Sequence, residues 1–551
     1  MKRWTVLPPV SVFHPATNTT SQICRDRSSR SEISRQPNTA QSSLLMAQEN
    51  GRRFLISSFA IRPFSRFLLP FSLFLCIMFA QSSYAQAPNG TIPASYFGLT
   101  FQNPTSFASS GVSIGSMGKV SAAEWGWMEP LPPGSACPSG FTAQGTHCYY
   151  WGKLDSYVQT ATNAGLPFMF VWNEAPCWAV HGQTDCSGVT DSGHTISNAC
   201  QATIKGGWEC SGPVQSGHTA DLQAFITALA TRYNGSNGHG LIHAYELQNE
   251  QFYTGTWAQL AAQSDIIVKA VKAANPSALI ACCGATVFNS PDCYSYQVGT
   301  CSTEAGGVTV FDGLWAAWGA IAGNSRQIDV VTYHGYPHSS NPVPEVITGD
   351  TCVQAGGGYA KCLHNLISRI GLPSDIPIWD TEASWQWNIC GSNGSGCAAE
   401  QAFIARMHLL DWAYGISQQQ WFDYEGPDSG PWYGQLNGIT VNKTAWNQVY
   451  NWMVGNTMST QCALASGSTV VWTCGFTKPN GTTTRAVWNT SGSSSYAITA
   501  AVWTDYKDLA GNTTSIASND TSVSIGIKPI LLESSGSTAP SAPTGLTAIV
   551  N

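Results

Sequence analysis

The sequence contains few charged residues. Asp, Glu, Lys and Arg make up 10% of its 551 residues, against about 25% in an average soluble protein. The formal net charge of -7 is spread along the chain, and no cluster of Lys or Arg follows the N-terminal segment. Binding to a phosphate backbone needs such a cluster. The composition therefore argues against nucleic acid as a partner.

The sequence also lacks the common motifs that bind metals and nucleotides. No C-x-x-C or H-E-x-x-H spacing occurs, which argues against zinc. Neither a phosphate-binding loop nor a dinucleotide fingerprint is present. The segment from Gly111 to Gly115 fits the pattern of a hydrolase nucleophile elbow, but no apolar strand leads into it. We therefore expect neither a metal nor a cofactor.

The N-terminal segment has the order of a signal peptide. Arginines at 52, 53, 62 and 66 precede an apolar run from Phe67 to Ala80, and small residues follow around Ala85 and Ala87. A membrane-spanning helix needs about 20 apolar residues, more than this run supplies. We predict cleavage near Ala85 or Ala87, secretion, and no membrane anchor in the mature chain; an uncleaved anchor is the alternative. Met46 would give the signal a more usual length.

Cysteines are numerous for a chain of this kind. Two of the 18, Cys24 and Cys76, precede the expected cleavage point, which leaves an even number behind it. Most of these form close pairs in sequence, and a cluster of four lies between Cys282 and Cys301. Behind a signal peptide, this pattern indicates disulfides that staple loops in an oxidising compartment. The pairs are Cys137 and Cys148, Cys177 and Cys186, Cys200 and Cys210, Cys352 and Cys362, Cys390 and Cys397, and Cys462 and Cys474.

Short β-rich runs alternate with helical stretches over residues 88–455, the predicted catalytic domain. Eight strands separated by helices indicate an α/β fold, a closed (β/α)8 or TIM barrel, whose site lies where the strands end. The predicted strands are Tyr96 to Phe101, Lys119 to Ala123, Pro167 to Trp172, Ile242 to Gln248, Ala278 to Cys283, Ile328 to His334, Ile376 to Asp380 and Gln418 to Tyr424.

Beyond Gly455 the helical pattern stops. Alternating segments separated by Gly, Asn and Ser predict a small β-sandwich over 456–533. Residues 534–551 are rich in Ser, Pro, Ala and Thr, and they are typical of a linker or of the start of a fibronectin type III module. Residues 1–87 form the N-terminal extension and signal peptide. The expected order is thus leader, barrel, sandwich and tail.

Two glutamates follow apolar runs at the ends of the fourth and seventh predicted strands. Glu250 follows the fourth strand and Glu382 follows the seventh. These two strands face each other across the mouth of a barrel. Cleavage of a glycosidic bond with retention needs one protonated and one ionised carboxyl about 5 to 5.5 Å apart. The pair therefore indicates this chemistry on a carbohydrate.

These residues carry a resemblance to a known group of enzymes. Glu246, Asn249 and Glu250, followed by Thr381 and Glu382, are similar to the matching positions of clan A glycoside hydrolases, and most of all family 39. The resemblance implies that Glu250 is the general acid/base, that Glu382 is the nucleophile, and that Asn249 holds the sugar 2-hydroxyl. The sequence departs from family 39 at Gln248, where Trp is usual, and at Gln251, where Pro is usual.

The resemblance implies further substrate-binding residues. His334 and Tyr336 match the His-x-Tyr that clan members place beside the nucleophile, so Tyr336 is expected to donate a hydrogen bond to Glu382 and His334 to contact the sugar. Trp421 matches a tryptophan beneath the cleaved sugar. Trp172 and Trp125 are further candidates for stacking, because flat aromatic faces bind pyranose rings. Asn173, next to Trp172, is a further candidate for binding the substrate. Lys119 stands where a family arginine is usual.

Two other readings stay open. Asn173 and Glu174 form a second Asn-Glu pair at a strand end, and a miscounted barrel would make Glu174 the acid. Asp380 is expected on the inward side of the seventh strand with Glu382, one layer deeper, as a buried hydrogen-bond partner. The alternatives to hydrolysis are transglycosylation by the same glutamates and an inactive barrel that only binds carbohydrate. The sugar, its linkage and endo or exo action are not encoded in these motifs.

Overall fold

The structure is a computed structural model. It describes residues 87–118, 124–180, 213–247, 249, 256–286, 306–337, 343–348, 359–385, 388–391, 394–426 and 434–535, together with the backbone of four short strands within 190–210. The predicted signal peptide, the C-terminal tail, Glu250 and Lys119 lie outside the described residues. No helix among the described residues is long and apolar enough to cross a membrane.

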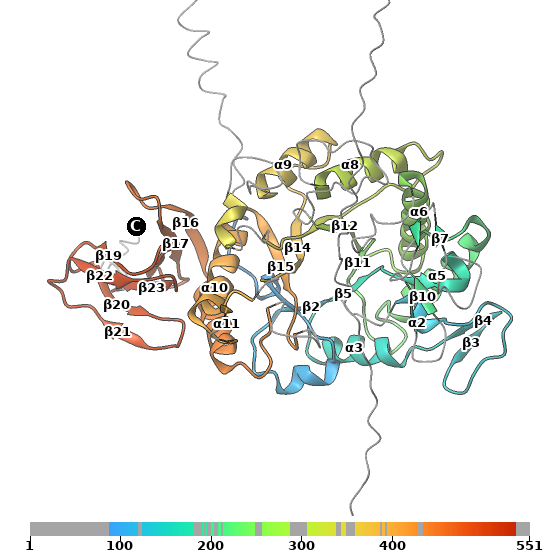
Figure 1. Ribbon diagram of the computed structural model, residues 1–551, viewed down its shortest axis with the longest axis horizontal. Coiled ribbons are helices and arrows are strands. Elements are labelled where there is room, and N and C mark those ends of the chain that lie inside the picture. Colours follow the sequence, from blue (N-terminus) through green and yellow to red (C-terminus); the bar gives the residue numbers. More distant parts are fainter. Residues whose placement is uncertain are drawn as a thin grey trace, which may run out of the picture. The chain divides into compact units, whose positions relative to one another are not determined.

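Eight parallel strands close into a barrel, as the sequence predicts (Figure 1). Each strand pairs with its neighbours in chain order, and the last strand pairs with the first. The strands are β1 (Phe97–Thr100), β2 (Ser116–Gly118), β5 (Phe168–Val171), β11 (Ala244–Glu246), β12 (Leu279–Thr286), β13 (Val330–His334), β14 (Ile378–Ala383) and β15 (Ile416–Trp421).

Helices surround the barrel strands (Figure 1). They bury apolar side chains such as Leu229, Val268 and Leu410 against the outer faces of the strands. The longer described helices are α3 (Gly152–Asn163), α5 (Thr219–Arg232), α6 (Trp257–Ala274), α8 (Gly306–Gly319), α9 (Tyr359–Arg369), α10 (Ala398–Ala413) and α11 (Thr440–Met453). The short helix α2 (Trp125–Met128) is the next described element after β2, and the short helix α4 (Cys177–Val180) follows β5 after the two-residue strand β6 (Ala175–Pro176).

The second strand was predicted at Lys119 to Ala123, a range that lies outside the described residues. The described strand β2 is Ser116–Gly118, just before that range, where no strand was predicted. In the barrel interior beside it, the Gln420 amide donates to Ser116 Oγ at 3.0 Å. A Cβ added at Gly118 would meet the same side chain at 3.3 Å. Small residues are needed here, and a strand of small residues has little apolar signature.

The C-terminal segment forms the predicted β-sandwich. Its larger sheet has the strand order β16-β17-β18-β23-β20-β21, and β19 pairs with β22 in a second sheet. Val487, Trp503 and Ile525 belong to the core that the strands share. The strands are β16 (Thr457–Leu464), β17 (Val471–Thr477), β18 (Thr483–Asn489), β19 (Ser494–Ala497), β20 (Trp503–Lys507), β21 (Thr513–Ser515), β22 (Ser522–Ile525) and β23 (Ile530–Ser534).

A buried ion pair joins this sandwich to the barrel layer. Arg406 of α10 donates to Glu345 of the 3-10 helix η5 (Pro344–Thr348) from two of its guanidinium nitrogens, Nε and Nη2. The indole of Trp488 on β18 donates to the same carboxylate at 2.8 Å. Loss of either partner would leave the Glu345 carboxylate buried and poorly solvated. Arg406 and Trp488 therefore both stabilise this contact between the sandwich and the barrel.

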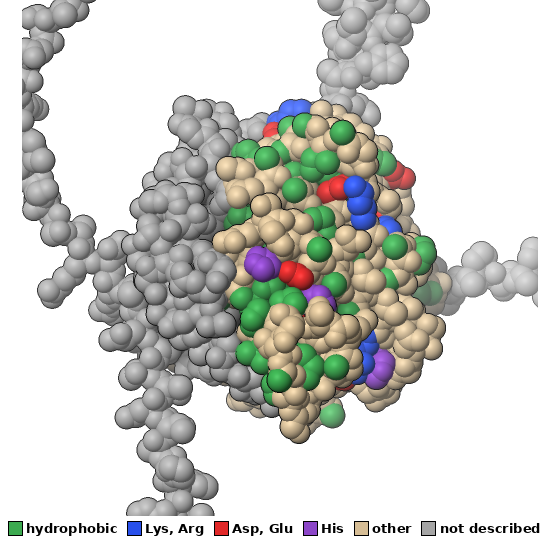
Figure 2. Space-filling view, turned by 90° about the vertical axis from the view of Figure 1, so that its right-hand side faces the viewer, with side chains coloured by type: hydrophobic (Ala, Val, Ile, Leu, Met, Phe, Trp, Pro, Cys, Tyr) green, Lys and Arg blue, Asp and Glu red, His purple; other side chains and the backbone are tan. Residues whose placement is uncertain are grey.

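Disulfides are present at three of the predicted pairs. Bonds join Cys137 to Cys148, Cys390 to Cys397 and Cys462 to Cys474. Within the cysteine cluster, Cys282 is bonded to its neighbour Cys283. Cys177 and Cys362 are also disulfide-bonded. The low charge content is visible as well, since Figure 2 shows few charged side chains on the described part of its face.

Candidate active site

Glu382 lies at the C-terminal end of β14, beside Tyr336 and His334, the two residues that the sequence predicts next to it. The Tyr336 hydroxyl donates a hydrogen bond of 2.7 Å to Glu382 Oε1. His334 Nδ1 lies 3.6 Å from Glu382 Oε2, and the imidazole is fully buried. The predicted contact between Tyr336 and Glu382 is therefore present, and three predicted site residues meet at one strand end.

A hydrogen bond links the seventh barrel strand to the fourth. Ala244 of β11 belongs to the small apolar cluster inside the barrel, and Glu246 lies on the same face of its strand. Thr381 Oγ1 donates to Glu246 Oε1 at 2.7 Å, and both side chains are fully buried. Glu246 Oε2 accepts no hydrogen bond from the described residues. This bond ties the strand that bears Glu382 to the strand that leads to Glu250.

The fourth strand ends close to the limit of the described residues. Asn249 is half-buried, and its Oδ1 accepts no hydrogen bond from the described part of the chain. Gln248, Glu250 and Gln251 lie outside the described residues. The distance between Glu250 and Glu382 therefore stays a prediction, whereas the strands that carry them have the predicted places in the barrel.

Asp380 is a buried hydrogen-bond partner, as expected, but it does not share the inward side of β14 with Glu382, so that part of the expectation was wrong. Thr381 faces the interior, and its neighbour Asp380 faces the other way, where its charge acts on Asp411 of α10. The register of β14 against β15 shifts between Asp380 and Ala383. A bulge of this kind redirects a side chain, which explains why Glu382 points to the mouth.

A second carboxyl pair lies at the ends of β2 and β5. Burial raises the pKa of Glu124 to about 8, and the charge of Glu174 adds to the rise, while a hydrogen bond from Asn173 opposes it. Asn173, predicted to bind substrate, thus contacts Glu124 in this structure. Sequence reasoning missed Glu124. Its proximity to Glu174 depends on the pairing of β2 with β5, and the sequence does not show the register of that pairing.

The three tryptophans proposed for stacking on sugar are buried in the protein core. Trp125 lies on α2 and not on a strand, stacks on Phe225, and donates from its indole to Glu129 at 2.7 Å. Trp172 is 2% exposed. Neither ring has a face open to a substrate in this structure.

Trp421 is fully buried as well, so its expected place beneath the sugar is corrected. Its ring packs against His408 of α10 and Trp446 of α11, and its indole donates to the Gly434 carbonyl at 2.7 Å. Gln420 points into the barrel, where a Cβ at Gly98 would meet it at 2.3 Å. Because side chains alternate along a strand, Trp421 must face the helices.

Phe422 is the aromatic residue next to Trp421, and by the same alternation we expect its side chain on the side of the barrel axis. It follows β15 directly and is half-buried, unlike Trp421. The next residue, Asp423, accepts a hydrogen bond from Gln102 Nε2 at 2.7 Å, which joins the end of β15 to the loop after β1. Sequence reasoning missed Phe422 because the adjacent tryptophan fits the family pattern.

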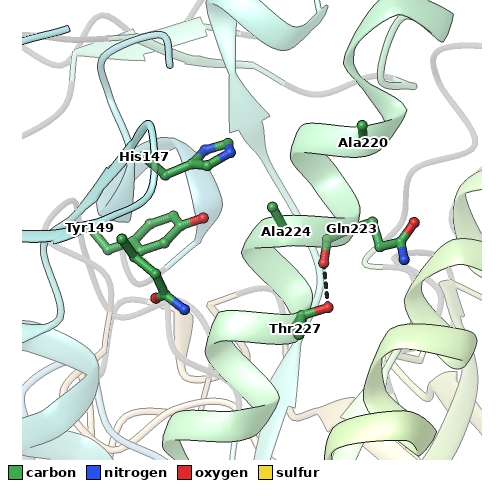
Figure 3. A pocket seen from close by; sticks show the side chains of 7 residues that line it. His147, Tyr149, Ala220, Gln223, Ala224 and Thr227 are labelled. Atoms are coloured by element: carbon green, nitrogen blue, oxygen red, sulfur yellow. Dashed lines mark hydrogen bonds between the residues drawn. The ribbon is translucent and has the colours of Figure 1, made fainter. Parts of the chain in front are cut away.

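A separate pocket of about 370 Å3 lies between the β-hairpin β3 (Thr142–Gln144) and β4 (His147–Tyr149) and helix α5 (Figure 3). His147 and Tyr149 face Ala224 and Thr227 across it (Figure 3). His147 Nδ1 lies 2.6 Å from Glu129 Oε1, and this hydrogen bond raises the pKa of His147. The pocket shares no lining residue with the group around Glu382.

Comparison with known proteins yields neighbours by structure alone. No family model and no curated protein matches the sequence. The fold is similar to that of a family 39 glycoside hydrolase from the gut symbiont Bacteroides cellulosilyticus WH2, with a TM-score of 0.51, 15% identity, and coverage of 80% of this chain and 81% of that one. It is also similar to a bifunctional glucanase-xylanase from a metagenome library, with a TM-score of 0.51, 14% identity, and coverage of 82% and 98% respectively. At such identities the similarity establishes a shared barrel fold, and the chemistry must be argued from the site.

Proposed function

We propose that the protein is a secreted, retaining glycoside hydrolase that cleaves β-glycosidic bonds in poly- or oligosaccharides. The observation that carries the proposal is the pair Glu382 and Tyr336, with a buried hydroxyl donating at 2.7 Å to a carboxylate at the end of the seventh barrel strand. A donor to the charged form of a carboxyl favours that form, as a nucleophile requires. The shared fold with two glycoside hydrolases supports the same conclusion.

The proposed reaction proceeds through two displacements. Glu250 gives its proton to the glycosidic oxygen while the Glu382 carboxylate attacks the anomeric carbon, so that the C–O bond breaks and a glycosyl ester forms. Glu250, now ionised, takes a proton from water, whose oxygen attacks the same carbon and releases Glu382. Two inversions give net retention. The steps balance with water alone, so we expect no cofactor and no metal.

The neighbouring residues have proposed roles in holding the sugar. Asn249 binds the 2-hydroxyl, and His334 contacts the sugar from the β13 side. We assign the platform beneath the ring to Phe422 in place of Trp421, because Phe422 is partly exposed and Trp421 is covered by two helices. Secretion is inferred from the apolar N-terminal run and is supported by disulfides, which persist in oxidising compartments.

Two experiments test the proposed function. Aryl β-glycosides of xylose, glucose, galactose, arabinose and glucuronic acid are offered to the purified mature chain, and the first-formed anomer is followed by NMR. We expect the β-anomer, whereas the α-anomer would refute double displacement. Azide should restore turnover to the Glu382→Gly variant with an α-configured glycosyl azide as the product, because azide then attacks in place of the carboxylate and the single displacement inverts the anomeric carbon. A Glu250→Ala variant with full activity would refute the assignment of the acid.

A further inference from the structure

Asp380 is a fully buried carboxyl to which the proposed reaction gives no role. It lies two residues before Glu382 on β14, facing away from the barrel interior. Its Oδ1 accepts a hydrogen bond of 2.9 Å from the backbone N–H of Gly335. The same N–H lies 3.1 Å from the backbone carbonyl of Glu382. Two groups of β14 thus hold the first residue after β13.

Glycine is needed at position 335 because the carboxyl lies against its backbone. A Cβ there would lie 2.1 Å from Asp380 Oδ2 and 2.8 Å from its Cγ. The carboxyl carbon sits at the end of a short side chain in a packed interior, so it has little room to move aside. Asp380 and Gly335 therefore fit each other closely, and the position of one restricts the other.

Tyr336 is the next residue along the chain, and its hydroxyl donates to Glu382. Two consecutive residues after β13 thus donate hydrogen bonds to side chains of β14: Gly335 to Asp380, and Tyr336 to Glu382. Resting on the proposed function, we infer that Asp380 is a positioning residue: by fixing Gly335 it holds the Tyr336 hydroxyl on the nucleophile Glu382.

The surroundings of Asp380 indicate which of its properties matters. The carboxyl of Asp411 on α10 and the phenol of Tyr333 on β13 lie on its side of the strand, and the charge of Glu246 on β11 acts on it from the barrel interior. Burial, and then the charge of Glu246, raise its pKa well above the usual range. The uncharged form still has an oxygen that accepts from Gly335. We therefore expect the acceptor atom, and not the charge, to be the essential property.

The test is a double-mutant cycle between Asp380 and Tyr336, measured as kcat/KM on the best aryl glycoside. Asp380→Ala should lower it about 10- to 100-fold, the range caused by misplacing a group of the site by roughly 1 Å. Asp380→Asn keeps an acceptor and should stay within about threefold of the wild type. In a Tyr336→Phe background, Asp380→Ala should cause little further loss, because the contact it supports is already gone.

Asp411→Asn is the matched control, since Asp411 is equally buried beside Asp380 but makes no hydrogen bond to the loop. It should leave kcat/KM unchanged. Independent losses that multiply in the double variant would overturn the inference, as would an Asp380→Asn variant as impaired as Asp380→Ala. If Asp380→Ala does not fold, Gly335→Ala takes its place in the same cycle, because its Cβ displaces the carboxyl.

Crystal structures separate this inference from the proposed function. In the wild type the Tyr336 hydroxyl should lie within hydrogen-bond distance of Glu382, and in Asp380→Ala or Gly335→Ala it should have moved away. An unmoved Tyr336 would refute the positioning role even if the enzyme is a glycosidase. A displaced Tyr336 in a chain without activity on any glycoside would instead leave the positioning intact and refute the proposed reaction.

Discussion

Thr381 donates a hydrogen bond of 2.7 Å to Glu246 and so joins the fourth and seventh strands inside the barrel. Thr381 lies one residue before the proposed nucleophile Glu382, and Glu246 lies four residues before the proposed acid Glu250. The hydrogen bond therefore ties together the two strands that lead to these residues. It also provides a hydroxyl donor to a carboxyl that has no access to solvent.

Replacing this hydroxyl should destabilise the protein. Thr381→Val keeps the shape of the side chain but leaves Glu246 Oε1 without its donor. A buried polar group without a partner costs about 1–3 kcal/mol, and urea unfolding should show a loss of that size. Thr381→Ser retains the hydroxyl and should lose less. Equal losses in the two variants would show that the hydrogen bond is not what matters.

Tyr336→Phe should impair catalysis with little effect on folding. A hydrogen bond to a charged group is worth about 1.5–3 kcal/mol, so kcat/KM should fall roughly 10- to 100-fold. Because the lost donor favoured the charged form of a carboxyl, the acidic limb of the pH profile of kcat/KM should move to higher pH. Tyr245→Phe is the control, since its buried hydroxyl has no hydrogen-bond partner among the described residues.

Phe422 and Trp421 should respond in opposite ways to substitution by Ala. Trp421→Ala removes a fully buried ring and should lower the free energy of unfolding by about 3–5 kcal/mol. Phe422→Ala should lower the free energy of unfolding much less and reduce kcat/KM more, since Phe422 is only half-buried and we place it under the sugar. Activity and chemical unfolding of both variants measure the difference. A Phe422→Ala variant with full activity would exclude the platform.

Glu124 should make the protein less stable as the pH rises. Burial first, and then the charge of Glu174, raise its pKa from 4.5 to about 8. The folded state therefore keeps a proton that the unfolded chain has lost, and stability falls as the pH rises from about 4.5 to about 8. Glu124→Gln removes this titration, so its Tm should decline less than that of the wild type between pH 5 and pH 8. Parallel declines in Tm would contradict the raised pKa.

The sequence predicts the barrel and the order of its strands because most strands are buried runs that end in polar residues. β11 and β14 follow this pattern, and the glutamates at their ends are the strongest signal of function. β2 escapes it because Ser116 and Gly118 must be small beside Gln420, which fills the interior at that level. Polar filling of a barrel interior is not visible in hydrophobic periodicity.

The orientation of side chains at the strand ends is what the sequence does not reveal. Trp421 fits a family pattern by residue type, yet its strand directs it outward and buries it, whereas the adjacent Phe422 is partly exposed. Asp380 and Glu382 are two residues apart and would share a face in a regular strand, but the register shift separates them. Bulges and register depend on the partner strand, so they appear only in the folded chain.

Trapping of the covalent intermediate tests the central claim most directly. The mature protein is incubated with the activated 2-deoxy-2-fluoro derivative of whichever aryl β-glycoside it hydrolyses, then digested and analysed by mass spectrometry. The proposed mechanism predicts a single glycosyl adduct on Glu382, and none in the Glu382→Gln variant. An adduct on Glu174, or hydrolysis of the parent glycoside with no adduct on any residue, would contradict it.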